Sequence, residues 1–277
     1  MSVINKINYL SDTKQLIKQS IINKGVDISE AESFSSYPSK IASISQETPE
    51  PLIFTSIENP SISSAYDFEK SLFKDINLLD VDTEFSTMKS MFYMYQGLEK
   101  VIWPVNIDTS NVTSMEQMFF QCHNLKNMDL GKFDTSKLTT TYSMFEGCKA
   151  LSSINFGSNW FCQNVTSMQS MFYGCSSLTT LDLFSVKTLK LTNVANMFYG
   201  CTSLVDVTWP DAWLANSAVT EFSLSDSPIS HDSCLKLFNR IQQRPLVPSI
   251  LSLSETTKSY MSDEEIAVAT NKGWTVA

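Results

Sequence analysis

Glycine and histidine are scarce in this chain of 277 residues, which has 8 glycines and 2 histidines. No glycine-rich turn of the kind that cradles a nucleotide phosphate is present. One histidine stands in the run His231-Asp232-Ser233-Cys234, which gathers catalytic residue types. Consecutive residues of a helix point in different directions, so this run cannot form a catalytic triad. The sequence therefore predicts a protein that is not an enzyme and that binds no cofactor.

Long hydrophobic runs are missing as well. Residues 1–10 contain no apolar stretch resembling the core of a signal peptide, and no segment reaches the length of a membrane-spanning helix. We therefore expect no membrane insertion. We also expect synthesis in the cytosol, where thiols stay reduced and a disulfide framework should not be assumed.

The sequence also lacks a cluster of basic residues. The net charge is −9, and residues 85–210 carry eight positive and eight negative side chains. Binding to nucleic acid through release of counterions needs clustered lysine and arginine. The balanced charge of this region therefore argues against a nucleic-acid partner.

Repetition is what the sequence has in abundance. A Met-Phe pair recurs with its methionine at positions 91, 118, 144, 171 and 197, so the period alternates between 27 and 26 residues. Apolar residues align into columns across these five copies. The columns include Phe92, Phe119, Phe145, Phe172 and Phe198, then Cys122, Cys148, Cys175 and Cys201, and then Leu98, Leu125, Leu151, Leu178 and Leu204. Self-similarity at such a period is the signature of a solenoid, whose repeats share one continuous core.

The spacing inside each copy predicts its local structure. Apolar residues three apart before the cysteine column predict one or two helical turns, and the final Leu-x-x-Leu-x-Leu pattern predicts a short strand. The predicted fold class is an α/β repeat, a leucine-rich-repeat solenoid with short parallel strands and short helices. A small helical N-terminal unit precedes the repeats, and a helix–strand cap closes the C-terminal end.

The cysteine column invites a metal or disulfide interpretation. Zinc ligands normally arrive as close pairs such as Cys-x-x-Cys, whereas these cysteines lie a full repeat apart among apolar columns. A ladder of buried thiols that behave as small hydrophobic residues fits this spacing better. We predict no metal site.

Motifs around the columns resemble those of a known family. They are Asn-Val-Thr-Ser-Met at 111–115, Met-Phe-Tyr-Gly-Cys at 171–175, Leu-Thr-Thr-Leu-Asp-Leu at 178–183, and Phe-Asp-Thr-Ser at 133–136. Over residues 85–210 the chain closely resembles the BspA-type leucine-rich-repeat family. The resemblance implies binding, commonly adhesion by surface proteins of bacteria and protists, and it implies no catalytic residues.

Alternation along each predicted strand identifies the side chains that face solvent. One predicted row is Lys100, Asn127, Ser153, Thr180 and Asp206, and the next is Ile102, Asp129, Asn155, Asp182 and Thr208. We treat these two rows as a candidate binding face. An ordinary solvated face is equally compatible with their polar composition.

The N-terminal segment carries a second resemblance. Residues 11–24 predict an amphipathic helix that ends at Gly25, and a second short helix follows. The run Lys24-Gly25-Val26 and the spaced residues Phe34, Tyr37, Lys40 and Ile41 resemble the N-terminal segment of many tailed-bacteriophage structural proteins. The residues assigned to virion anchoring are Leu16, Ile17, Ile21, Phe34, Tyr37 and Ile41. The alternative is a plain helical hairpin that covers the end of the solenoid.

We divide the chain into four parts: a helical anchoring segment (1–48), an acidic linker with a degenerate capping repeat (49–84), five leucine-rich repeats (85–210) and a C-terminal helix–strand cap (211–277). In the cap we expect strands at 222–224, 250–253 and 274–276. Ser230 is the predicted N-cap of a helix, and Ser262 with Glu265 has the spacing of a capping box at the start of another helix.

These observations lead to one hypothesis and one alternative. The hypothesis is a non-enzymatic bacteriophage virion protein, such as a tail, fibre or head-decoration component, assembled in the host cytoplasm. Its N-terminal segment would contact other virion proteins, its repeats a host cell-surface protein or glycan, and homo-oligomerisation stays open. The alternative is an adhesin on the bacterial cell surface, or secreted, whose signal peptide has been removed.

Overall fold

The computed structural model describes residues 52–53, 75–77, 85–158, 160–216, 218–243 and 247–277. Contacts divide the chain into two units, Met1–Glu50 and Pro51–Ala277, and every described residue belongs to the second. The predicted helices at the N-terminus and the predicted anchoring positions Leu16, Ile17, Ile21, Phe34, Tyr37 and Ile41 lie outside the described residues. That prediction stays untested.

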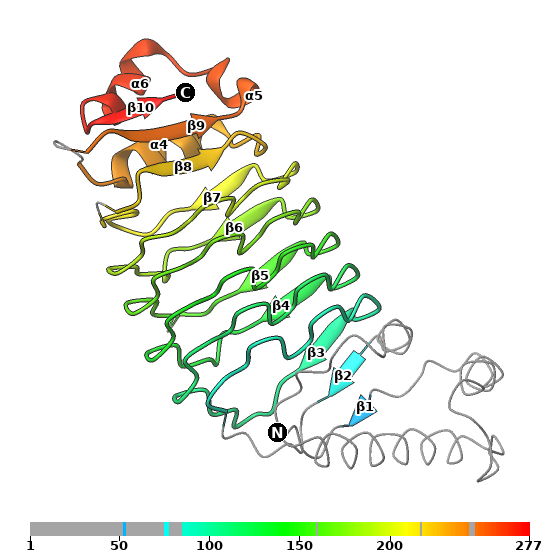
Figure 1. The fold of residues 1–277 in the computed structure, drawn as a ribbon. Helices are drawn as coiled ribbons and strands as arrows, with labels where there is room; N and C mark the ends of the chain where they lie inside the picture. Colours follow the sequence, from blue (N-terminus) through cyan, green and yellow to red (C-terminus); the bar gives the residue numbers. More distant parts are fainter. Residues whose placement is uncertain (1–51, 54–74, 78–84, 159, 217, 244–246) are drawn as a thin grey trace, which may run out of the picture. The chain divides into compact units, whose positions relative to one another are not determined.

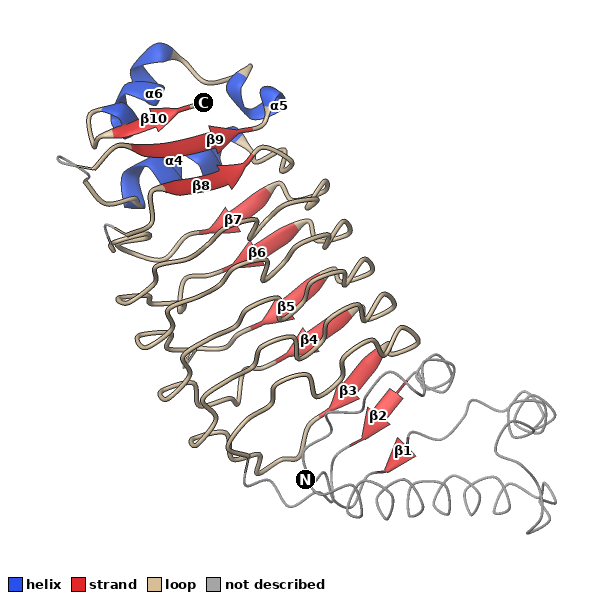
Figure 2. Cartoon of the chain, viewed as in Figure 1, coloured by secondary structure: helices blue, strands red, loops and turns tan. Residues whose placement is uncertain are grey.

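Each of the five repeats contributes one short strand, two further short strands precede the repeats, and the strands run parallel (Figures 1 and 2). The strands are β1 (Leu52–Ile53), β2 (Asp75–Asn77), β3 (Lys100–Ile102), β4 (Asn127–Asp129), β5 (Ser153–Asn155), β6 (Thr180–Asp182) and β7 (Asp206–Thr208). Hydrogen bonding joins them as β1-β2-β3, β4-β5 and β6-β7. Equivalent residues of successive repeats face one another in register, for example Leu181 and Val207. The predicted short parallel strands are confirmed, and the architecture is a repeat-like α/β arrangement.

The Met-Phe segments do not form the predicted helical turns. No helix occurs among the described residues of 85–210, where these segments are successive tight turns. Ser143 and Gly147 have φ angles of 51° and 77°. Their N–H groups donate to Gln169 O (2.9 Å) and Tyr173 O (2.7 Å) of the following repeat. In an α-helix these donors would bond four residues back within the same segment, so bonding to the neighbouring repeat excludes the helix.

The same backbone conformation recurs in every copy. Positive φ angles occur at Ser90, Met94, Gln117, Gln121, Ser143, Gly147, Ser170, Gly174, Asn196 and Gly200. A second contact line runs beside these turns, where parallel bridges join Ser114 to Thr140, Thr140 to Ser167 and Ser167 to Asn193. Neighbouring threonines strengthen this line, since Thr139 and Thr192 donate through Oγ1 to the carbonyls of Thr113 and Thr166 at 2.8 and 3.0 Å. Turns, bridges and strands thus connect each repeat to the next.

The columns read from the sequence form the core. The phenylalanine column is fully buried from Phe119 to Phe198 and stacks ring on ring, with centroids 5.3 Å apart for Phe119–Phe145 and an interplanar angle of 3°. The leucine column from Leu98 to Leu204 is fully buried as well. Thr141, a polar residue in an otherwise apolar column, donates to the sulfur of Met171 at 3.3 Å. The shared core of the repeats is therefore as the periodicity predicts.

Beyond the repeats, the segments between successive strands contain helices. Strand β8 (Glu221–Leu224), helix α4 (His231–Arg240), strand β9 (Ser249–Leu253), helix α5 (Glu255–Lys258), helix α6 (Asp263–Thr270) and strand β10 (Trp274–Val276) follow in order. The strands form a parallel sheet in the order β10-β9-β8. Ser230 caps α4, and Ser262 with Glu265 forms a capping box at α6, so both predicted helix starts are confirmed. Helix α5 was not predicted.

Candidate functional site

The ten residues of the candidate binding face occupy the outer positions of β3 to β7. Nine of them are exposed and Ile102 is half-buried, whereas the central residue of each strand points into the core. Strand register brings equivalent members together, pairing Asn127 with Ser153 and Thr180 with Asp206. The structure thus arranges these side chains in two rows on one face. Whether that face binds a partner stays a prediction.

Hydrogen bonds link several of these side chains along the rows. Ser153 Oγ donates to Asn127 Oδ1 at 2.6 Å, and Asn155 Nδ2 donates to Asp129 Oδ1 at 2.9 Å. Asp206 Oδ1 accepts a bond of 2.6 Å from Ser230 Oγ. Such bonds reduce the side-chain freedom of the face, so a partner would meet a partly ordered polar surface.

Part of the second row has a local structural role. The side-chain oxygens of Asp129, Asn155 and Asp182 accept the N–H of the residue two positions on, each at 2.9 Å. This is the bond by which Asp and Asn start a turn after a strand. These three side chains therefore stabilise the turn that follows each strand, and they are also exposed to solvent.

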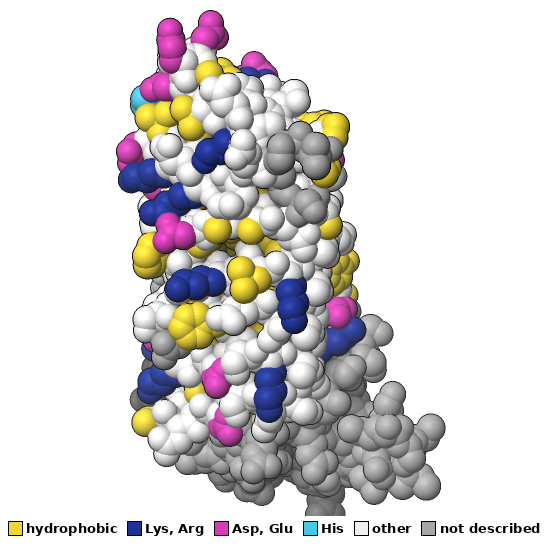
Figure 3. Space-filling model, turned by 90° about the vertical axis from the view of Figure 1, so that its left-hand side faces the viewer, with side chains coloured by type: hydrophobic (Ala, Val, Ile, Leu, Met, Phe, Trp, Pro, Cys, Tyr) yellow, Lys and Arg dark blue, Asp and Glu magenta, His cyan; other side chains and the backbone are white. Residues whose placement is uncertain are grey.

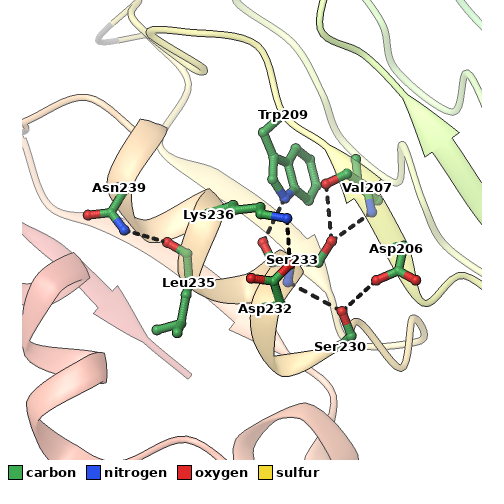
Figure 4. A network of polar contacts seen from close by, with 9 residues as sticks. All are labelled: Asp206, Val207, Trp209, Ser230, Asp232, Ser233, Leu235, Lys236 and Asn239. Carbon is green, nitrogen blue, oxygen red and sulfur yellow. Dashed lines mark hydrogen bonds and ion pairs between the residues drawn. The ribbon is translucent and has the colours of Figure 1, made fainter.

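The face ends where β7 meets helix α4 instead of another repeat strand (Figure 4). Ser233 Oγ accepts the Val207 N–H at 2.8 Å and donates to the Val207 carbonyl at 3.1 Å. Trp209 Nε1 donates to the Ser233 carbonyl at 3.0 Å, and Asp232 forms an ion pair with Lys236. A serine side chain therefore takes the place that a neighbouring strand would occupy.

The side chains of the run His231-Asp232-Ser233-Cys234 point to different parts of the structure. Ser233 is bound to β7, while His231 Nε2 lies 2.8 Å from Glu265 Oε1 on α6. Cys234 is buried in the core, and burial raises the pKa of its thiol to about 12. These four residue types do not converge on one point.

The cysteine column is a hydrogen-bonded ladder as well as a hydrophobic one. Cys148 Sγ donates to Phe119 O at 3.1 Å and Cys175 Sγ to Phe145 O at 3.2 Å, each reaching back to the preceding repeat. All six cysteines are free and buried. Burial raises the pKa of the Cys148 and Cys175 thiols well above the ordinary value, so both stay protonated. Sequence reasoning recognised their burial but missed these bonds.

Sequence reasoning also missed a second aromatic column, formed by the residue after each phenylalanine of the Met-Phe pairs. Its members are Tyr93, Phe120, Glu146, Tyr173 and Tyr199. Tyr93 stacks on Phe120 and Tyr173 on Tyr199, both with centroids 4.8 Å apart. The signal was visible in the alignment of the five copies, where four of the five residues are aromatic.

Acidic and basic side chains are intermixed on the surface of the repeats. On the face drawn in Figure 3, basic, acidic and hydrophobic groups alternate with neutral ones. Lys89 and Lys126 form ion pairs across repeats with Glu116 (2.9 Å) and Glu99 (2.5 Å). In the described part of the chain, no group of three or more His, Cys, Asp or Glu residues is arranged to hold a metal ion.

The helices of the described residues are short, the longest being α4 with 10 residues. None combines the length and the apolar character needed to cross a membrane.

Comparison with known proteins gives one family. The chain matches the family described as "Mycoplasma protein of unknown function, DUF285" over residues 61–178 and 153–223, together more than half of its length. No curated protein matches the chain. The matched segments cover the repeats and end within β8, just before the first capped helix. The chain therefore belongs to the DUF285 family, which is related to the BspA-like repeat proteins.

Proposed function

We propose that this protein is a non-enzymatic binding protein, a leucine-rich-repeat solenoid of the BspA type that presents its strand face to a protein or to a cell-surface glycan. The observation that supports the proposal is the pair of rows on β3 to β7, in which every side chain except Ile102 is polar and exposed and several are ordered by side-chain hydrogen bonds. Repeat proteins commonly bind through such extended surfaces.

The biological setting we propose is a bacteriophage virion, as a tail, fibre or head-decoration component, with residues 1–48 attached to other virion proteins. This setting rests on the resemblance of the N-terminal segment alone. The family match begins at residue 61 and so does not bear on that segment. A bacterial surface or secreted adhesin is the alternative, because the BspA-like relationship of the repeats fits both settings.

Immunoelectron microscopy separates the two settings. An antibody raised against residues 85–210 is applied to negatively stained phage particles and to cell envelopes from the same lysate, and antibody pre-absorbed with purified protein is the control. We expect label at a fixed position on the particles. Label confined to cell envelopes would overturn the virion setting and support the adhesin.

The strand face itself is tested by substitution. Thr180→Lys combined with Thr208→Lys places two long charged side chains on the exposed rows, and Ser136→Lys places one on a loop outside the rows. If the strand face binds, the double variant should bind target cells about tenfold more weakly in flow cytometry, the change that ~1.4 kcal/mol produces. Equal binding by both variants would exclude the strand face.

A further inference from the structure

The loop that follows strand β6 exposes two large hydrophobic side chains. The exposed fraction is 54% for Phe184 and 64% for Leu189. In the three preceding repeats the position of Phe184 is held by proline or glycine, and that of Leu189 by serine or glutamine. These equivalent residues are Pro104, Gly131 and Gly157, and Ser110, Ser136 and Gln163. The shared core of the repeats therefore does not require either hydrophobic side chain.

The backbone of this loop is attached firmly to the core. Asp182 Oδ1 accepts the Phe184 N–H at 2.9 Å, directly after the strand. Val186, Thr188 and Leu191 are buried, and the residues between them are exposed. The exposed side chains are thus presented from a fixed backbone, so little backbone freedom is lost when a partner binds them.

Helix α4 holds the Phe184 ring in place. The Arg240 guanidinium carbon lies 5.9 Å from the centroid of this ring, within the range of a cation–π contact. Arg240 is itself ion-paired with Asp211, from the loop after β7. Phe184 therefore lies beside a charged group and is not buried among other hydrophobic side chains.

The same loop carries uncompensated positive charge. Lys187 and Lys190 are exposed, and residues 183–192 contain no aspartate or glutamate. Neither lysine forms an ion pair with any residue of the described ranges. Lys190 Nζ donates to the neutral Asn164 Oδ1 at 2.8 Å. We call the four side chains of Phe184, Lys187, Leu189 and Lys190 the β6 loop surface.

Charge and polarity decide which partner fits the β6 loop surface. Two exposed apolar groups beside two free cations complement a segment that carries both apolar side chains and carboxylates. A bilayer fits less well, because insertion of Phe184 would draw the Arg240 guanidinium toward hydrocarbon. The net charge of −9 also opposes approach to an anionic membrane. A short segment senses mainly the charges within a Debye length, about 8 Å.

We propose that the β6 loop surface binds an acidic, apolar segment of a partner protein. Phe184 and Leu189 contact the apolar side chains of that segment, and Lys187 and Lys190 contact its carboxylates. The surface lies on a loop and not on the strand rows, so it stands or falls independently of the strand face.

The test uses the full chain as bait for a displayed library of random short peptides. Enriched peptides are synthesised with a fluorescent label, and their affinity is measured by fluorescence anisotropy. We expect the enriched peptides to combine aspartate or glutamate with leucine, isoleucine or phenylalanine. Their affinity should fall as salt is added, because exposed charge pairs are screened.

Two variants assign the binding to the loop. Lys187→Glu combined with Lys190→Glu should weaken binding of the enriched peptides by about tenfold or more, since two attractions become repulsions. Leu189→Ser removes apolar contact area and should weaken binding by about tenfold as well. It introduces the residue that two preceding repeats carry at this position, so the fold should tolerate it. Circular dichroism checks the fold of every variant.

The loop after β4 offers a matched control. Lys132→Glu combined with Lys137→Glu makes the same change of charge there, and both lysines are exposed. Lys137 Nζ donates to Asn111 Oδ1 at 2.7 Å, as Lys190 does to its asparagine. This loop has no exposed large hydrophobic side chain. The control variant should bind the enriched peptides as the wild type does.

Several outcomes would overturn the proposal. They are an absence of enriched peptides, enriched peptides without acidic residues, and equal weakening by the two charge-reversed variants. Sedimentation with vesicles of phosphatidylcholine and phosphatidylserine that is lost in the Lys187→Glu and Lys190→Glu variant would identify a membrane instead. Dimerisation of the wild type that is lost in this variant would identify a second copy of the chain.

Discussion

The repeats of residues 85–210 and the C-terminal part of residues 211–277 place parallel strands side by side by two different means. In the repeats, tight turns with left-handed residues connect β3 to β7, and helices are absent from the described residues there. In the C-terminal part, helix α4 connects β8 to β9, and helices α5 and α6 connect β9 to β10. The family match covers the first kind of unit and ends at residue 223, within β8 of the second.

The two parts also differ in where their backbone N–H groups find hydrogen-bond acceptors. A turn segment sends alternate N–H groups to the next repeat, as Gly174 does to Tyr199 at 2.7 Å. A helix satisfies its own N–H groups and needs only caps, which Ser230 and Ser262 provide. The repeats therefore depend on their neighbours more than the C-terminal units do.

The junction between the two parts shows the same rule. Gly200 belongs to the last repeat, and its N–H donates to Asp226 Oδ2 at 2.8 Å instead of to a repeat carbonyl. Ser233 supplies both a donor and an acceptor to Val207 of β7. Side chains thus replace the missing backbone partners and close the hydrogen-bond pattern of the repeats.

The largest expected effect comes from Leu178→Ala, which opens a cavity in the fully buried leucine column. We expect a loss of about 2–5 kcal/mol in the free energy of unfolding, measured by urea denaturation. Leu237→Ala removes an equally buried leucine of α4 and serves as the partner variant. Hydrogen exchange should rise in the repeats on both sides of Leu178, and only beyond residue 210 for Leu237.

An unchanged melting temperature for Leu178→Ala would contradict the assignment of the core. Exchange confined to the substituted repeat would contradict the dependence of each repeat on its neighbours. Thr179→Ala, at an exposed position beside Leu178, is the control and should change stability little.

A smaller effect is expected from two glycines with similar φ angles, Gly157 (66°) and Gly174 (72°). A Cβ at Gly174 would meet its nearest neighbour atom at 3.8 Å, whereas a Cβ at Gly157 would lie 2.7 Å from the backbone of Gly131. Gly174→Ala therefore isolates the cost of a left-handed residue, about 1 kcal/mol. Gly157→Ala adds a steric overlap with backbone and should cost roughly 2 kcal/mol or more. Thermal unfolding measures both, and equal losses would show that the close approach to Gly131 is unimportant.

Periodicity alone predicted the columns, the strand positions and their inward and outward residues. This succeeds because each column position repeats one environment, so five copies identify the same buried face. The capped helices were also predictable, since Ser230 and the pair Ser262 and Glu265 carry a local signal that does not depend on distant contacts.

The turns were not predictable, and the reason is physical. Apolar residues three apart, such as Phe172 and Cys175, fit a helical turn as well as a tight turn with a bond three residues back. The discriminating feature is a left-handed φ at residues such as Ser143 and Gln117, which are not glycine and give no sign of it. The bonds of the cysteine ladder were hidden for a similar reason, because Cys148 and Phe119 O belong to different repeats.

The candidate binding face was predictable in position only. Alternation located Asp129, Asn155 and Asp182 on the exposed side, but their turn-forming bonds depend on the loop geometry after each strand. The interruption of the second aromatic column at Glu146 has the same character. The alignment shows a glutamate in an aromatic column, whereas its hydrogen bond with Ser143 and the stacked rings require coordinates.

The smallest expected effect concerns alkaline pH. Burial raises the pKa of Cys201 in the repeats, like that of Cys162, from 9.0 to about 12. An unfolded chain releases these protons near 9.0, while the folded chain retains them to about 12. The unfolded state therefore binds fewer protons in this window, so the free energy of unfolding is unaffected below about pH 9 and falls as the pH rises toward 12.

Cys201→Ala isolates the contribution of one thiol, because lysine and tyrosine ionisation is common to both proteins. At one pH unit above the ordinary thiol pKa, the wild type should lose roughly 1 kcal/mol more of its free energy of unfolding than the variant, relative to neutral pH, measured from urea midpoints.

Cys234→Ala tests the same effect in α4, where burial also raises the thiol pKa to about 12. Since Cys234 contributes through a helix with its own backbone bonds, its loss should leave hydrogen exchange in the repeats unchanged. Increased exchange in the repeats of Cys234→Ala would mean that the two parts unfold as one unit, and the contrast between them would then be limited to their hydrogen bonding.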